Sequence, residues 1–185
     1  ALLGEVLKRI DPQRRSYRQI VAEDLLKPLG MKDTWIGVRR DLKERHLVPE
    51  FRGNSPTQHL GHSNLGPNGA FEEEEAEMPW VGGVSTAADM YRFAEMLRRG
   101  GELDGARIVS PTMIARARRC WAGDKPNELY RKIYEGRRWE VLPAYIGLGF
   151  TLRGDRMGHH LFGTLTSPET FGQHGAGTTI FWVDP

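Results

Sequence analysis

The sequence lacks several features that would place it in a protein class at once. Its 185 residues include a single cysteine, Cys120, which excludes an internal disulfide and any cysteine-rich metal site. Cys120 lies in a helical pattern beside Trp121, so we expect it to act as a small buried hydrophobic side chain. No stretch approaches the roughly 18 consecutive apolar residues that a membrane span needs. The net charge of +2, from 26 Lys and Arg against 24 Asp and Glu, is too small to indicate nucleic-acid binding.

A complete nucleophilic site is also missing. The pattern Gly-x-Ser-x-Gly is not matched, and the nearest segment, residues 61–65, ends in leucine instead of glycine. Neither Ser-x-x-Lys nor Tyr-x-Asn occurs anywhere in the chain. A nucleophilic serine needs a base and an oxyanion site beside it, so these residues alone supply no convincing nucleophile.

Metal and phosphate sites are poorly supported as well. His59 and His62 are three residues apart in a glycine-rich loop, and His159-His160 adds imidazoles without a fixed geometry, so loop histidines are favoured over metal ligands. The glycines between Gly172 and Gly177 lack the lysine and the following helix of a phosphate-binding loop. The arginines fall on the outer faces of predicted helices. We therefore expect no metal, no cofactor and no nucleic-acid partner.

Helices dominate the first part of the chain. Apolar residues at helical spacing predict a helix that includes residue 1 and is closed by Asp11-Pro12, with one face formed by Leu3, Val6, Leu7 and Ile10. A second helix is predicted to begin at Ser16, with Gln19 completing a capping box, and to end at Pro28. We expect it to bury Tyr17, Ile20, Val21 and Leu25. Residues 51–80 show no period, and a loop of that length in a compact domain is commonly functional or disordered.

Two further helices and a tight turn follow that loop. Thr86 and Asp89 predict a capping box, and Gly100-Gly101 should end the helix that follows it. Its expected buried stripe is Met90, Phe93, Ala94 and Leu97. Asp104-Gly105 is typical of a tight turn. Ser110-Pro111 predicts another helix start, with Met113, Ile114, Ala117 and Cys120 buried.

Strands are expected late in the chain. Residues 122–143 are charged and predicted to be irregular, whereas Tyr145–Leu152 and Thr178–Val183 have the β-branched and aromatic composition of strands. Helices followed by two or three late strands favour an α+β fold with an antiparallel sheet over a doubly wound parallel one.

A glycine-rich segment precedes the last predicted strand. Gly172, Gly175 and Gly177 surround Gln173 and His174. Such a density of glycine indicates either a tight turn or the close approach of another backbone or a ligand. Polar side chains in the segment favour a ligand, and a hairpin turn with solvated side chains is the alternative.

The two ends lead to a further expectation. Residue 1 begins inside an amphipathic helix with no preceding cap, and Asp184-Pro185 stops where a strand should turn towards its next partner. We therefore expect an internal part of a longer protein. The residues leave localisation and oligomeric state open.

A series of short motifs in fixed order resembles the serine beta-lactamase-like family, which includes AmpC-type beta-lactamases, D-alanyl-D-alanine carboxypeptidases and carboxylesterases. In chain order these motifs are Leu2–Leu7, Leu26–Thr34, Gly82–Phe93, Gly100–Pro111, Ile146–Phe150, Phe171–Gly177 and Val183–Pro185. The resemblance covers nearly the whole chain. It implies a partial beta-lactamase/transpeptidase-like domain over residues 1–185, with helices packed on an antiparallel sheet.

The resemblance also implies a chemistry, which is acyl transfer through a serine. In this family Ser-x-x-Lys supplies the nucleophile and its base partner, Tyr-x-Asn supplies a proton shuttle, and a third motif (Lys-Thr-Gly or His-x-Gly) forms a wall of the site from an edge strand. The first two motifs would lie before residue 1. The substrate would be a small-molecule ester, amide or peptide.

The third motif is the part that carries over, at Gln173-His174-Gly175. The pattern most naturally puts Gln173 in the place of the Lys or His, although a one-residue slip would put His174 there. Gly175 would let the substrate pass close to the strand, and the N–H of Ala176 would be one oxyanion donor. Because glutamine carries no charge, esterase or peptidase-like activity is expected rather than efficient lactamase activity. A non-catalytic relative that binds peptides or cell-wall fragments is the alternative hypothesis.

Overall fold

The computed structural model describes residues 2–47, 77–175 and 179–185. The chain divides into two compact units, Ala1–Phe93 and Ala94–Pro185, and each is described by itself. None of the helices in the described segments is long and apolar enough to cross a membrane.

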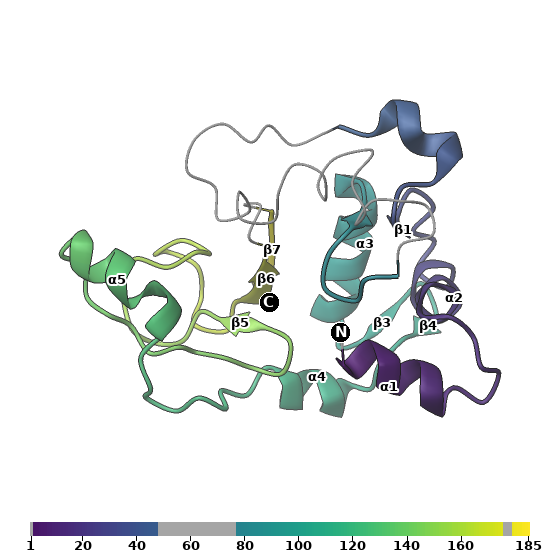
Figure 1. Cartoon of the computed structure of the whole chain (residues 1–185). Helices are drawn as coiled ribbons and strands as arrows, with labels where there is room; N and C mark the ends of the chain where they lie inside the picture. Colours follow the sequence, from purple (N-terminus) through teal and green to yellow (C-terminus); the bar gives the residue numbers. More distant parts are fainter. Residues whose placement is uncertain (1, 48–76, 176–178) are drawn as a thin grey trace. The chain divides into compact units, whose positions relative to one another are not determined.

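The first unit consists mainly of helices, drawn in purple and blue in Figure 1. In chain order its elements are α1 (Leu2–Ile10), α2 (Tyr17–Val21), the π-helical turn η1 (Ala22–Leu26), β1 (Trp35–Ile36), the 3₁₀ helix η2 (Arg40–Arg45), β2 (Gly83–Val84) and the start of α3 (Ala87–Arg98). β1 and β2 pair antiparallel, with Trp35 opposite Val84.

The predicted capping box at the start of α2 is confirmed. The Ser16 side chain accepts a hydrogen bond from the Gln19 N–H, and the Gln19 side chain accepts one from the Ser16 N–H. The predicted buried face is wrong, because the four residues named for it are only half-buried. α2 continues into the π-helical turn, whose wider spacing changes which side faces inward, so that Ala22 and Leu26 are buried instead.

Asp89 connects the start of α3 to the segment before β1. Its N–H donates to Thr86 Oγ1, as the predicted cap requires. Its carboxylate Oδ2, however, accepts hydrogen bonds from the Asp33 N–H (2.8 Å) and the Thr34 hydroxyl (2.7 Å). The residue expected to complete a local capping box therefore stabilises a contact between segments more than 50 positions apart.

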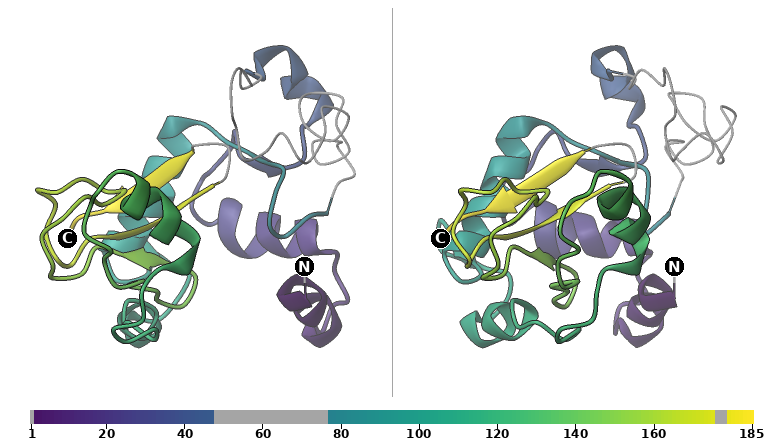
Figure 2. Two further views of the ribbon diagram at one scale, coloured as in Figure 1. Left: turned by 60° about the vertical axis from the view of Figure 1, so that its left-hand side comes forward. Right: turned by 90° about the vertical axis from the view of Figure 1, so that its left-hand side faces the viewer.

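The second unit contains the end of α3, a hairpin, two helices and a sheet. Its elements are β3 (Glu102–Leu103), β4 (Ala106–Arg107), α4 (Pro111–Ala117), α5 (Glu128–Gly136), β5 (Thr151–Leu152), β6 (Phe171–His174) and β7 (Ile180–Val183). Figure 2 shows the yellow strands of this unit from two sides, together with the green helix α5.

The predicted helix end and tight turn are confirmed. α3 ends at Arg98, and Gly100 and Gly101 adopt positive φ values of 71° and 98°. β3 and β4 pair antiparallel around Asp104 and Gly105, whose φ values of 50° and 81° fit a two-residue hairpin turn.

The predictions for residues 110–143 are confirmed in part. Ser110 caps α4 by accepting from the Met113 N–H, and Ile114 is buried, but Met113 itself is 56% exposed. Cys120 lies beyond the end of α4 and is only half-buried. The prediction that residues 122–143 are irregular is wrong, because they contain α5.

The late strands form one antiparallel sheet in the order β5-β6-β7. The strand predicted over Tyr145–Leu152 is shorter than expected, because the chain turns through Gly149, at φ 77°, and Ile146 pairs back onto Thr151. Helices with antiparallel strands confirm the predicted α+β fold. The buried apolar side chains of this region are Leu142, Ala144, Leu152, Phe162, Phe171 and Val183.

Candidate functional site

The third motif begins on a strand instead of in a turn. Gln173 and His174 are the last two residues of β6, which lies between β5 and β7. A Cβ atom on Gly172 would lie 2.1 Å from the Phe181 carbonyl oxygen of β7. Of the two interpretations of the glycine-rich segment, the close approach of another backbone therefore holds at Gly172, and the turn is wrong for residues 171–174.

β6 is a central strand, but among the described strands only β7 pairs with the end that carries the motif. β5 pairs with Phe171 and Gly172, whereas within the described residues Gln173 and His174 pair only with Phe181 and Ile180 of β7. The expected edge strand is thus replaced by a local edge, two residues long, where β6 extends past β5. An unpaired edge offers backbone N–H and C=O groups to other partners.

The Gln173 side chain lies along this local edge. Its Nε2 donates to the Gly149 carbonyl oxygen (3.2 Å), and its Oε1 accepts from the His174 N–H (3.0 Å). The exposed amide therefore links the turn before β5 to the backbone of the motif. A lysine at this position could not make the second contact, because an ammonium group has no acceptor.

His174 makes different contacts. Successive side chains of a strand point to opposite faces, which separates His174 from Gln173. The His174 Nε2 is hydrogen-bonded to the Tyr130 hydroxyl of α5, with 5.7 Å between the two ring centroids. Its Nδ1 is buried and has no hydrogen-bond partner among the described residues. Gln173 and His174, the two candidates for the Lys or His position of the motif, thus have different environments.

Gly175 begins the connection to β7. Its N–H donates to the Thr179 carbonyl oxygen (2.9 Å), and a Cβ at this position would lie 2.8 Å from the Thr179 hydroxyl. A side chain here would need the threonine to move. Ala176, for which we predicted an oxyanion N–H, lies outside the described residues.

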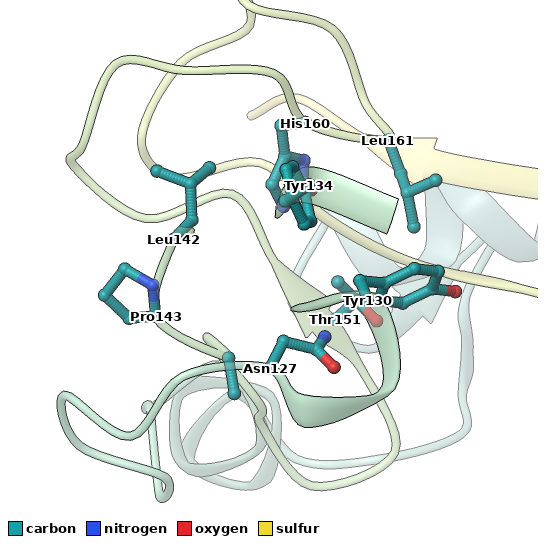
Figure 3. A pocket seen from close by; sticks show the side chains of 9 residues that line it. Asn127, Tyr130, Tyr134, Leu142, Pro143, Thr151, His160 and Leu161 are labelled. Carbon is teal, nitrogen blue, oxygen red and sulfur yellow. The ribbon is translucent and has the colours of Figure 1, made fainter. Parts of the chain in front are cut away.

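Sequence reasoning missed Tyr130, which belongs to the helix that was not predicted. A signal was present: Tyr130 and Tyr134 are four positions apart, and Gly136 ends the helix. The two rings line a small pocket of about 20 Å³, which is on the scale of one water molecule. Figure 3 shows them in this pocket with Asn127, Thr151 and His160.

Burial sets the ionisation of the groups around this pocket. It raises the pKa values of the Tyr130 and Tyr134 hydroxyls above the ordinary tyrosine value. It also lowers the pKa of His160 to about 4, helped by the positive charge of Arg153. His160 Nδ1 accepts a hydrogen bond from the Phe162 N–H (3.2 Å), as a neutral imidazole can. At neutral pH all three groups are therefore uncharged.

The other candidates from the sequence do not join this site. His59, His62 and residues 61–65 lie outside the described residues. His159 stacks on Trp139, with ring centroids 3.9 Å apart. Within residues 2–47, 77–175 and 179–185, no three His, Cys, Asp or Glu side chains are grouped so that they could hold a metal ion.

Comparisons with a family model and with known proteins agree on one family. The family model described as Beta-lactamase matches residues 1–185. Protein Rv1367c of Mycobacterium tuberculosis is 30% identical over 154 residues, which cover 82% of this chain and 34% of that protein. Esterase/beta-lactamase LipL of the same organism is 28% identical, over 76% of this chain and 28% of its own length. The chain thus spans about a third of the length of these relatives.

A solved structure supports the same fold. A penicillin-binding protein homologue from Caulobacter crescentus aligns with all of this chain and 47% of its own, at 27% identity and a TM-score of 0.63.

Proposed function

Because this chain belongs to the beta-lactamase family, we propose that the protein containing it is a serine hydrolase that cleaves an ester or amide through an acyl-enzyme. The observation that carries the proposal is the third motif at the open end of β6, with its backbone edge unpaired by β5. In this proposal the nucleophile and its base lie outside the 185 residues, and the chain alone is inactive.

The reaction would proceed in two steps. The serine oxygen bonds to the substrate carbonyl carbon, and the leaving alcohol or amine takes a proton as its bond to that carbon breaks. Water then attacks the acyl-enzyme and releases the acid. In both steps the carbonyl oxygen becomes an oxyanion, for which the Ala176 N–H is the proposed donor from this chain. One such donor contributes about 3–4 kcal/mol of transition-state stabilisation.

The remaining residues of the motif would select the substrate. Gly175, whose neighbourhood has little room for a side chain, would allow the substrate close to the strand. Gln173 offers an uncharged amide in the place of a lysine or histidine. A substrate carboxylate would therefore gain no ion pair there, which favours a neutral ester or a peptide over a beta-lactam.

The test uses the intact protein, a fluorophosphonate probe and two chromogenic substrates, p-nitrophenyl butyrate and nitrocefin. We expect one labelled serine outside residues 1–185 and faster turnover of the ester than of nitrocefin. The isolated 185-residue chain should not be labelled. Intact protein that neither labels nor hydrolyses either substrate would contradict the proposal and favour the alternative, a relative that binds peptides or cell-wall fragments without cleaving them.

A further inference from the structure

The hydrogen bond between α5 and β6 connects the third motif to a helix whose role the family chemistry leaves open. Tyr130 lies in the first turn of α5, and its hydroxyl reaches Nε2 of His174, the middle residue of the motif. Both side chains are half-buried. Tyr134, one turn further along the helix, instead donates its hydroxyl to the His159 carbonyl oxygen (3.0 Å).

The Tyr130 hydroxyl can donate to His174 Nε2 or accept from it, according to the tautomer of the imidazole. Burial raises the pKa of the Tyr130 hydroxyl, so this group stays protonated at neutral pH and can donate to Nε2. A neutral imidazole that accepts at Nε2 carries its own proton on Nδ1. A hydroxyl that donates to Nε2 favours the tautomer with its proton on Nδ1, the buried ring nitrogen that has no hydrogen-bond partner among the described residues.

The same contact holds a strand end that has few others. β5 does not pair with Gln173 or His174, so in the part of the chain that the structure describes these two residues pair only on the β7 side. The Gln173 amide secures the strand on one face through Gly149, and the Tyr130 hydroxyl secures the His174 ring on the other. Loss of either contact leaves the strand end freer to rotate.

We propose that Tyr130 is a positioning residue, which fixes the tautomer and orientation of His174 and so holds the third motif in place for acyl transfer. The proposal rests on the proposed function. The proposal predicts a loss in the rate of the chemical step, since a motif that moves by a fraction of an ångström aligns the reacting groups poorly but still admits substrate.

The kinetic experiment compares Tyr130→Phe with Tyr134→Phe in the intact protein. Each change removes one hydroxyl from the same face of the same helix. With p-nitrophenyl butyrate we expect Tyr130→Phe to lower kcat about fivefold to tenfold and to change KM less than twofold, the scale of one lost hydrogen bond. Tyr134→Phe should stay within twofold of the unmodified protein in both constants. Equal losses in the two variants would overturn the proposal.

A double-mutant cycle separates positioning from packing. If Tyr130 acts through His174, the double variant Tyr130→Phe with His174→Ala should be no slower than His174→Ala alone. Losses that multiply would show that the hydroxyl acts independently of His174, and the proposal would fail.

The tautomer of His174 can be measured by NMR without any hydrolase activity. Nitrogen-15 NMR of the His174 ring in the intact protein should show the Nδ1-protonated tautomer in the unmodified protein and in Tyr134→Phe, and a mixture in Tyr130→Phe. An unchanged spectrum in Tyr130→Phe would contradict the proposed tautomer control. If the unmodified protein has no hydrolase activity, the proposed function fails, and the spectrum still decides whether Tyr130 controls His174.

Discussion

At the scale of single residues, Gln173 sets the charge at the open end of β6. Its amide both donates to Gly149 and accepts from the His174 N–H, which only a neutral group with both functions can do. A lysine would lose the second contact and gain a positive charge. The amide of Gln173 therefore connects the strand end to Gly149 without adding charge.

Gln173→Lys should shift the substrate preference of the intact protein towards carboxylate-bearing beta-lactams. We expect the ratio of kcat/KM for nitrocefin to that for p-nitrophenyl butyrate to rise about tenfold, since a charge-assisted hydrogen bond is roughly twice as strong as a neutral one. Gln173→Met, which loses both hydrogen bonds of the amide and adds no charge, is the control. A ratio that rises equally in both variants would exclude charge as the cause.

His160 gives the protein a predictable dependence on pH. Its pKa is lowered to about 4, first by burial and then by Arg153, so the folded state keeps the ring neutral where an unfolded chain would protonate it. Between about pH 6.5 and 4 the unfolded state binds more protons, and stability falls as the pH falls.

His160→Gln should flatten this dependence. Urea unfolding of the intact protein measures the free energy of unfolding at pH 7 and at pH 4.5. Between these pH values the unmodified protein should lose roughly 1–2 kcal/mol more than His160→Gln does. His159→Gln is the matched control and should keep the full loss. A His160→Gln protein that loses as much stability as the His159→Gln protein would contradict the assignment.

At the scale of elements, the capping residues before α2 make the hydrogen bonds that the sequence predicts. The capping box of Ser16 and Gln19 has both of its hydrogen bonds. Ser16→Ala removes one acceptor and should lower the free energy of unfolding by about 1 kcal/mol. Ser16→Asp, which keeps an acceptor, should be close to neutral. Thermal unfolding followed by circular dichroism measures both, and similar losses would argue against capping as the source of stability.

The turn between β3 and β4 offers a second test of local geometry. Gly105 has a φ of 81°, and a Cβ added there would meet no atom within 4 Å, so any loss on substitution comes from backbone strain alone. Gly105→Ala should destabilise by about 1 kcal/mol. Gly136→Ala is the control. A Cβ there also meets no atom within 4 Å, but Gly136, the last residue of α5, does not have a positive φ. Chemical denaturation should show no loss in the control, and an equal loss in both would exclude strain.

At the scale of the whole molecule, the apolar stripe of α1 is exposed. Its helical periodicity was predicted correctly, and its four residues Leu3, Val6, Leu7 and Ile10 are 79%, 42%, 42% and 67% exposed. Exposed apolar groups in a contiguous stripe favour association.

We expect the isolated 185-residue chain to be poorly soluble or to associate. Light scattering coupled to size-exclusion chromatography should show species larger than a monomer, and Leu3→Lys with Ile10→Lys should reduce them. The exchange Arg9→Lys, on the same helix, should have no effect. Cooperative thermal unfolding of a monomer in the unmodified chain would count against this expectation.

The local elements could be predicted because their signals lie within a few residues. The caps at Ser16 and Ser110, the glycines after α3 and the hairpin at Asp104-Gly105 each depend on the conformation of their own residues. The buried face of α2 was predicted less well. The π-helical turn that follows it changes which side of the helix faces inward, and no residue type in the sequence indicates such a turn. α5 was missed because charged residues obscured its Tyr130, Ile133 and Tyr134 spacing.

The sequence by itself determined the α+β class and the family, since composition, spacing and motif order are properties of the chain alone. Only the tertiary structure decided that Gln173 and His174 face opposite ways at an edge left open by a short β5, and that Tyr130 reaches His174 across 44 positions. The physical reason is that strand register and helix packing join residues remote in sequence, and hydrogen bonds between them leave no periodic trace in either segment.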